Sequence, residues 1–268
     1  MTDTGRIRWA GFAFALLAGT LFGIGGTFGQ FLFQQRGVDL DWLVTVRLLV
    51  SGGALLLLAA MRDGAALLAP WRNRGDGVQL LVFAIFGMLA VQYTYFAAIH
   101  ASNTATATVL QYTGPAMIAV WLAVAGRRWP LPRELAAIVL ALAGTWLLVT
   151  HGRPGALSIS PLALFWGLAS AVAAAFYSLQ PVGLLHRYKA SHITGWGMLV
   201  GGIALSFHHA PWDISGTWDA VAIIFLLFIF VFGTLLSFYL YLKAVRLIGA
   251  QKTSLLSCAE PFAAAVLA

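Results

Sequence analysis

The sequence predicts an all-α fold: a polytopic membrane helix bundle made of two inverted five-helix repeats. Three observations predict it. The chain is 60% hydrophobic and only 9% charged, whereas a soluble domain carries about a quarter charged residues. Apolar runs long enough to cross roughly 30 Å of hydrocarbon recur along the chain. Finally, stretches of the second half repeat the first half at a constant offset.

Nine apolar segments are predicted as membrane spans. The first is too long and too glycine-rich for a cleavable signal sequence, so it is interpreted as the first span. The last is still apolar where the sequence stops at Ala268, and we therefore expect a tenth span to be missing. The predicted spans are residues 9–33, 41–61, 77–99, 103–125, 133–150, 160–183, 193–207, 217–242 and 252–268.

The basic residues predict the orientation of these spans. With the N-terminus in the cytoplasm, thirteen Lys and Arg residues lie on the inner side and only Arg36 and Arg153 on the outer side. Such an excess is the positive-inside pattern of membrane proteins. The net charge of +7 is thus explained by topology, and no nucleic-acid partner is predicted.

Internal repetition predicts the domain organisation. Residues 80–122 align without a gap on residues 226–268, at an offset of 146, with twelve of 43 positions identical. A weaker match relates "RLLVSGGAL" at Arg47 to "GMLVGGIAL" at Gly197, at an offset of 150. Matching spans are five apart, so the two copies cross the membrane in opposite directions, as in transporters with inverted repeats. We expect one repeat over residues 1–150 and a second, truncated before its last helix, over 151–268.

Polar side chains recur at matching places in the fourth and ninth predicted spans. Each proline there removes the hydrogen bond to the carbonyl four residues earlier, which predicts a kink beside polar groups. Such stripes should face protein or a water-filled cavity. The alternative is a simple kink with small-residue packing between helices. The residues are Thr108, Gln111 and Pro115 in one span and Ser254, Ser257 and Pro261 in the other.

Two charged residues fall inside predicted spans. Glu260 replaces the glycine of the first repeat, Gly114. It is interpreted as a partner for an ammonium group or as a proton relay, or else as a structural ion pair. Arg47, in the second span, is a possible charge partner: it contacts substrate, neutralises a carboxylate or extends toward the membrane surface.

Aromatic and amide side chains within the spans are candidates for the wall of a binding pocket. Their rings could enclose an apolar or aromatic group, or they could simply pack between helices. The single cysteine excludes an internal disulfide. The adjacent His208 and His209 are interpreted as an outer loop rather than a metal site, and neither a metal nor a cofactor is predicted. The candidate pocket residues are Gln92, Tyr95, Trp166, Tyr177, Tyr239 and Tyr241.

These residues resemble a known family. The glycine-rich "GTLFGIGGTFGQ", Arg47 in the second span, "QYTGPAMIAV" in the fourth and "SCAEPFAAAV" in the ninth are similar to the drug/metabolite transporter superfamily of EamA-type ten-helix exporters. Within it the chain looks most like the YddG-type exporters of aromatic and other amino acids. The resemblance implies helices around a central cavity that opens alternately to each side, and a location in the bacterial inner membrane.

The leading hypothesis is therefore a monomeric exporter of amino acids and related small metabolites, surrounded by membrane lipid. Whether export is facilitated or proton-coupled stays open. A transporter of drugs, sugar nucleotides or organophosphates is the alternative within transport, although anions of that kind would need several cationic residues. An intramembrane lipid-acting enzyme would need a nucleophile or metal constellation that the sequence does not show. A non-transporting scaffold would not need paired polar stripes.

Overall fold

The computed structural model describes residues 3–126 and 159–257, together with six positions from 132 to 143. Throughout these residues the regular secondary structure is helical, which confirms the predicted all-α membrane bundle. Six of the described helices are long and apolar enough to cross a membrane. The predicted span 193–207 is a shorter helix of 17 residues. Most of the predicted span 133–150 and most of 252–268 lie outside the described residues.

The first half of the chain comprises α1 (Asp3–Arg36), α2 (Leu40–Asp63), η1 (Gly64–Leu68), α3 (Ala69–Arg72), α4 (Arg74–Val82), η2 (Phe83–Leu89), α5 (Ala90–Ala101), α6 (Thr104–Gln111) and α7 (Gly114–Ala125). The second half comprises α9 (Pro161–Leu179), α10 (Val182–Arg187), α11 (Ala190–Ser206), α12 (Ala220–Phe230), η3 (Val231–Leu236), α13 (Ser237–Ile248) and α14 (Ala250–Leu256).

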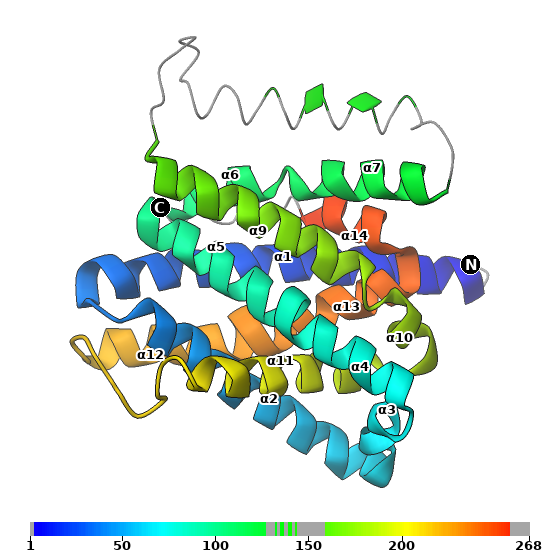
Figure 1. Cartoon of the computed structure of the whole chain (residues 1–268), viewed down its shortest axis with the longest axis horizontal. Helices are drawn as coiled ribbons and strands as arrows, with labels where there is room; N and C mark the ends of the chain where they lie inside the picture. Colours follow the sequence, from blue (N-terminus) through cyan, green and yellow to red (C-terminus); the bar gives the residue numbers. More distant parts are fainter. Residues whose placement is uncertain are drawn as a thin grey trace.

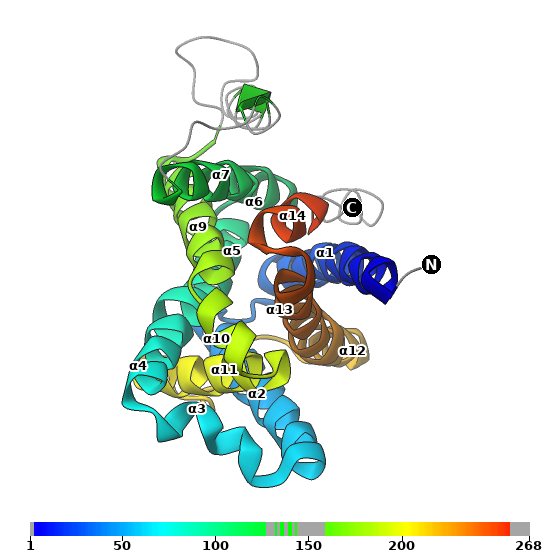
Figure 2. The ribbon, with the colours of Figure 1, turned by 90° about the vertical axis from the view of Figure 1, so that its right-hand side faces the viewer.

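The long helices lie roughly along one axis, and successive spans run along it in opposite directions within residues 3–126 and again within residues 159–257 (Figure 1). Viewed end-on, α1 and α13 lie on one side of the bundle and α9 and α5 on the other, with α2 and α11 below and α14 above (Figure 2). Helix α1 packs against α12, η3 and α13, while α9 packs against η2 and α5. The halves of the chain are therefore interleaved rather than separate.

At one end of the bundle, helices α2, α6, α9 and α12 begin with polar N-cap residues. The Asp39 carboxylate accepts from the Trp42 amide at 2.8 Å, and Asn103, Ser160 and Asp219 cap α6, α9 and α12 in the same way. Such side chains satisfy amide groups that a helix leaves without partners. At the other end, α13 stops at Gly249, whose φ of 87° suits glycine. Local sequence thus explains where the spans turn.

Two long helices contain a π-helical segment at matching places. In the span formed by α4, η2 and α5 it is Phe83–Leu89, and in the span formed by α12, η3 and α13 it is Val231–Leu236. Gly87 and Gly233, paired by the 146-residue offset, lie in these segments. π-segments are rare and are frequent at functional sites.

Helices α2 and α11 cross through reciprocal glycine contacts. A β-carbon on Gly52 would lie 2.6 Å from the backbone nitrogen of Leu199, and one on Gly202 would lie 2.9 Å from that of Leu49. The 150-residue offset converts each of these contacts into the other. Reciprocal contacts of this kind are the signature of a two-fold relation.

Candidate functional site

A cavity lies at the centre of the bundle, between helices of both halves of the chain. It encloses about 740 Å³ of empty space, counting its opening. Its lining is mostly apolar with a few polar groups, the usual composition of a small-molecule site. The lining residues are Phe22, Gly25, Gly26, Arg47, Val91, Gln92, Tyr95, Phe96, Gln111, Tyr112, Pro115, Ala174, Tyr177, Ile229, Gly233, Phe238, Tyr241, Ser254 and Ser257.

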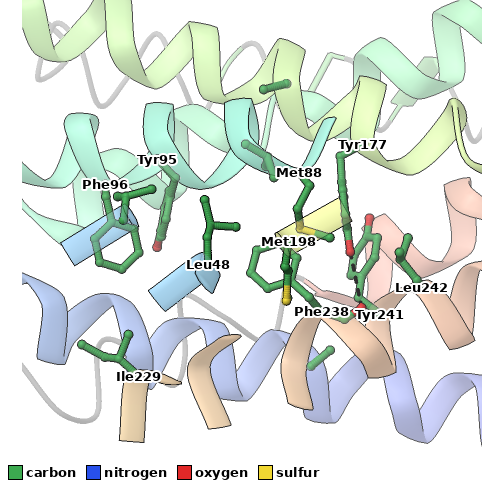
Figure 3. Packing of buried hydrophobic residues seen from close by; sticks show 14 of the residues in the cluster. Leu48, Met88, Tyr95, Phe96, Tyr177, Met198, Ile229, Phe238, Tyr241 and Leu242 are labelled. Atoms are coloured by element: carbon green, nitrogen blue, oxygen red, sulfur yellow. Dashed lines mark hydrogen bonds between the residues drawn. The ribbon is translucent and has the colours of Figure 1, made fainter. Parts of the chain in front are cut away.

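Aromatic rings form two groups along this cavity. Tyr177, Phe238 and Tyr241 gather at one end and Tyr95 and Phe96 at the other, as Figure 3 shows. The ring centroids of Tyr177 and Phe238 are 5.5 Å apart in an edge-to-face arrangement. Such contacts hold the rings in place, so the aromatic wall of the cavity can bind an apolar group without rearranging its side chains.

Hydroxyl pairs fix the tyrosines of both groups. The Tyr95 hydroxyl lies 2.7 Å from that of Thr108, and the Tyr241 hydroxyl lies 2.7 Å from that of Ser178. Buried tyrosine hydroxyls need such partners, because burying an unpaired polar group is costly.

Arg47 supplies positive charge to the cavity. Its side chain is only 3% exposed. Nε donates to the Thr234 hydroxyl at 3.0 Å, and the guanidinium carbon lies 4.2 Å from the centroid of the Phe96 ring. Nη1 is buried and has no hydrogen-bond partner among the described residues. Within the part of the chain that the structure describes, Arg47 therefore retains donor capacity beside the cavity.

Gln92 adds an amide to the same cavity. It is 2% exposed, and its amide nitrogen lies 3.3 Å from the Met88 sulfur. Oε1 has no partner within the described residues. The Ser257 hydroxyl donates to the Thr253 carbonyl at 2.9 Å, while the Tyr112 hydroxyl donates to the Ser257 carbonyl. That last contact joins the fourth span to the ninth.

Most of the predicted site residues that the structure describes line the cavity, but three do not. Thr108 is fully buried behind Tyr95. Trp166 packs edge-on against Tyr93, and the ring of Tyr239 lies 5.5 Å from the Lys243 ammonium. The predicted residues along the lining are Arg47, Gln92, Tyr95, Gln111, Pro115, Tyr177, Tyr241, Ser254 and Ser257. Glu260 and Pro261 lie outside the described residues.

The fourth span is broken rather than merely bent. Helix α6 ends at Gln111 and α7 begins at Gly114, with Pro115 in its first turn. The expected common face of Thr108, Gln111 and Pro115 assumed a continuous helix. The break lets Gln111, Tyr112 and Pro115 reach the cavity while Thr108 stays behind its wall.

Sequence reasoning missed the apolar part of the lining. Phe22, Phe96, Phe238 and Ile229 resemble any apolar residue of a spanning segment. One signal was available for Tyr112, because it lies within the quoted "QYTGPAMIAV" beside Gln111.

A possible cation site lies at the capped end of the bundle, away from the cavity lining. Ligand atoms of Asp39, Asp41 and His209 lie within 4.8 Å of one another. The acids and the histidine are far apart in the sequence, so their spacing did not reveal this cluster. Exposed acidic groups gather in this way without a metal, and no role is assigned to them.

Ion pairs join the two halves of the chain at both ends of the bundle. At one end Asp76 contacts Arg187 at 2.8 Å, and Asp63 contacts Lys189 and His192. At the other end Arg36 contacts Asp219 at 2.8 Å. The Ala222 amide and then Arg36 hold the pKa of Asp219 below its ordinary value, so its carboxylate is charged at neutral pH.

Comparison with known proteins identifies the architecture. The model of the EamA-like transporter family matches residues 9–150 and 161–268. A protein of Salmonella typhimurium named "Uncharacterized inner membrane transporter YicL" is 43% identical over 94% of this chain and 84% of its own length. The "Aromatic amino acid exporter YddG" of Ancylobacter novellus is 24% identical over 70% of this chain and 66% of its own.

A solved crystal structure supports the fold. It has a TM-score of 0.68 and 21% sequence identity, and it covers 98% of this chain and 87% of that one. At this identity the likeness concerns the fold alone. Taken with the family match and the apolar helices, these findings show that the chain belongs to the EamA-like transporter family and is a multi-pass transporter of the inner membrane.

Proposed function

We propose that this transporter exports amino acids, aromatic and others, and related small metabolites by alternating access through the central cavity. The observation that carries the proposal is the cavity itself. It combines aromatic walls with two buried polar groups, Arg47 and Gln92, whose hydrogen-bonding capacity the described residues do not fully use. A zwitterion with an apolar side chain has the matching chemistry.

The proposed substrate contacts follow the lining. The aromatic side chain of a substrate would lie among Tyr95, Tyr177 and Tyr241, and its polar end near Gln92, Gln111 and Ser257. From sequence alone, Glu260 belongs to the polar end as a partner for the ammonium group. Pro115 and Pro261 would bend the two spans that face each other. The YddG relative, named as an aromatic amino acid exporter, favours the same substrate class.

We further propose that the transporter consists of two inverted repeats, residues 1–150 and 151–268. Three observations support this division: the separate family matches, the reciprocal contacts of Gly52 and Gly202, and the matching π-segments. Because the cavity lies within one chain, a monomer suffices for the proposed activity.

The runner-up is the transport of sugar nucleotides or other organophosphates. A phosphate dianion would call for several cationic side chains, and in the described part of the cavity lining Arg47 is the one that is present. Amino acids and neutral drugs therefore fit this lining better.

A flux assay tests the proposal. Purified protein in liposomes loaded with L-phenylalanine should exchange external labelled phenylalanine, with saturation and with competition by other amino acids. Liposomes without protein provide the background. Competition by organophosphates instead would favour the runner-up, and an absence of flux for every solute would favour a scaffold. An imposed pH gradient distinguishes the two mechanisms of export: it should change the rate of proton-coupled flux and leave the rate of facilitated flux unchanged.

A further inference from the structure

Arg47 has an unusual position for a charged side chain. It lies seven residues after the start of α2, about 10 Å along the helix axis. At this depth it is buried among apolar groups and lines the cavity. A buried cation is costly unless an anion or several acceptors compensate it.

The described part of the chain compensates this charge only partly. One hydroxyl, from Thr234, accepts from Nε, and the Phe96 ring faces the guanidinium. No described carboxylate lies within ion-pair distance, and Nη1 is left without a partner there. Among the described residues, the guanidinium therefore has an unfilled position for an anionic acceptor.

In the second half of the chain, the equivalent helix crossing contains no arginine. The position equivalent to Arg47 is Gly197, and that of Thr234 is Met88. A β-carbon on Gly197 would lie 2.8 Å from the Phe83 ring and 3.6 Å from the β-carbon of Met88, so these positions meet without any charge. The same helix crossing is thus built once with a cation and once with a glycine.

From this asymmetry, and from a guanidinium nitrogen that no described residue pairs, we infer that Arg47 binds the carboxylate of the transported substrate and so restricts transport to carboxylate-bearing molecules. The inference rests on the proposed amino-acid export and specifies its chemistry. A guanidinium matches the planar carboxylate with parallel hydrogen bonds, and a buried site strengthens them. Phe96 and Tyr95 flank the charge, so the apolar part of the substrate would extend along the aromatic wall.

The first test uses wild-type protein and a series of substrates in liposomes at neutral pH. L-Phenylalanine should be exchanged, whereas its carboxamide and phenethylamine, which lack the carboxylate, should be exchanged at least about 30-fold less efficiently. Equal exchange of phenylalanine and its carboxamide would overturn the inference while leaving the proposed function intact. Stronger competition by phenyl phosphate than by phenylalanine would overturn the assignment to a carboxylate. Failure to exchange any amino acid would instead remove the proposed function.

The second test changes the residue. Arg47→Gln should reduce phenylalanine exchange at least about 30-fold, and Arg47→Lys should restore part of it because the charge returns without the planar fork. Both variants should stay folded by size-exclusion chromatography, since Gly197 serves in the equivalent place. Arg62→Gln, at an exposed position of the same helix, is the matched control and should transport normally.

Two results would overturn the role of Arg47. The first is normal phenylalanine exchange by Arg47→Gln. The second is recovery of exchange in the double variant Arg47→Gln, Glu260→Gln, because then the two charges would merely neutralise each other within the chain.

Discussion

Thr108 shows how a residue behind the cavity wall can act on the cavity. Its hydroxyl lies 2.7 Å from that of Tyr95, whose ring lines the cavity, while Thr108 itself is fully buried. Thr108 is therefore a positioning residue in our interpretation: it holds Tyr95 and does not touch the substrate.

Thr108→Val should weaken substrate binding without abolishing transport. The variant keeps the shape of the side chain and removes the hydrogen bond, which is worth about 0.6 kcal/mol inside a membrane bundle. We expect the KM for phenylalanine to rise about threefold, with little change in the maximal rate, in the liposome assay.

Thr94→Val is the control for this prediction. Its hydroxyl donates to the Ala90 carbonyl of its own helix at 2.7 Å, and it holds no ring of the cavity. An equal rise of the KM in both variants would contradict the positioning role of Thr108.

Helices α2 and α11 depend on close backbone approach. Gly52 and Gly202 each face the backbone of the other helix, at Leu199 and Leu49. Small residues at such crossings let spanning helices pack without a hydrophobic driving force between them. Arg47 lies on α2 close to this crossing, so the contact also determines where its guanidinium reaches the cavity.

Gly52→Ala and Gly202→Ala should destabilise the protein by similar amounts. Each added methyl group would meet backbone at under 3 Å, and overpacking of this kind costs about 1–3 kcal/mol. Thermal unfolding in detergent measures the effect. Gly53→Ala, which would meet no atom within 4 Å, is the matched control and should unfold near the wild-type temperature. If Gly52→Ala lowered the unfolding temperature and Gly202→Ala did not, the result would contradict the reciprocal crossing.

At the scale of the whole molecule, ion pairs join the two halves of the chain at both ends of the bundle. Asp76 with Arg187 and Asp63 with Lys189 join them at the end that the basic residues predict to be cytoplasmic. Arg36 with Asp219 joins them at the opposite end. In an alternating-access cycle, the two sets would have to break in turn.

Asp76→Asn should favour opening toward the predicted cytoplasmic side, and Asp219→Asn opening toward the other. Asparagine caps helices as well as aspartate does, so Asp219→Asn removes the charge while keeping the cap of α12. We expect each variant to raise labelling from its own side about two- to fivefold, because each pair has one exposed member, Arg187 or Asp219, and ion pairs at the surface contribute up to about 1 kcal/mol.

The measurement is the reaction of an impermeant maleimide with Ala174→Cys, a lining position, in a Cys258→Ser background. Right-side-out and inverted vesicles distinguish the two sides. Asp213→Asn removes an exposed acid that makes no ion pair among the described residues, and it should change neither rate. Increased labelling from both sides in either variant would indicate general loosening instead of directed opening.

The pattern of the sequence predicted the membrane bundle and many of the residues that meet at its centre. Hydropathy is sufficient for spans because the bilayer requires long apolar helices. Tyr177, Tyr241 and Gln111 stood out because polar groups in hydrocarbon need partners. Phe22 and Phe238 did not, because an apolar ring that faces a cavity looks the same in sequence as one that faces lipid.

The sequence by itself determined the membrane architecture. Apolar runs, basic loops and repeated segments are local features of the sequence, and they can be recognised without knowledge of tertiary contacts. The tertiary structure decided which faces of these helices enclose the cavity. Helix crossings such as that of Gly52 with Leu199, and the break before Gly114, set the rotation of each span. That rotation left Thr108 behind the wall and brought Arg47 into it, because side-chain direction depends on contacts between residues distant in sequence.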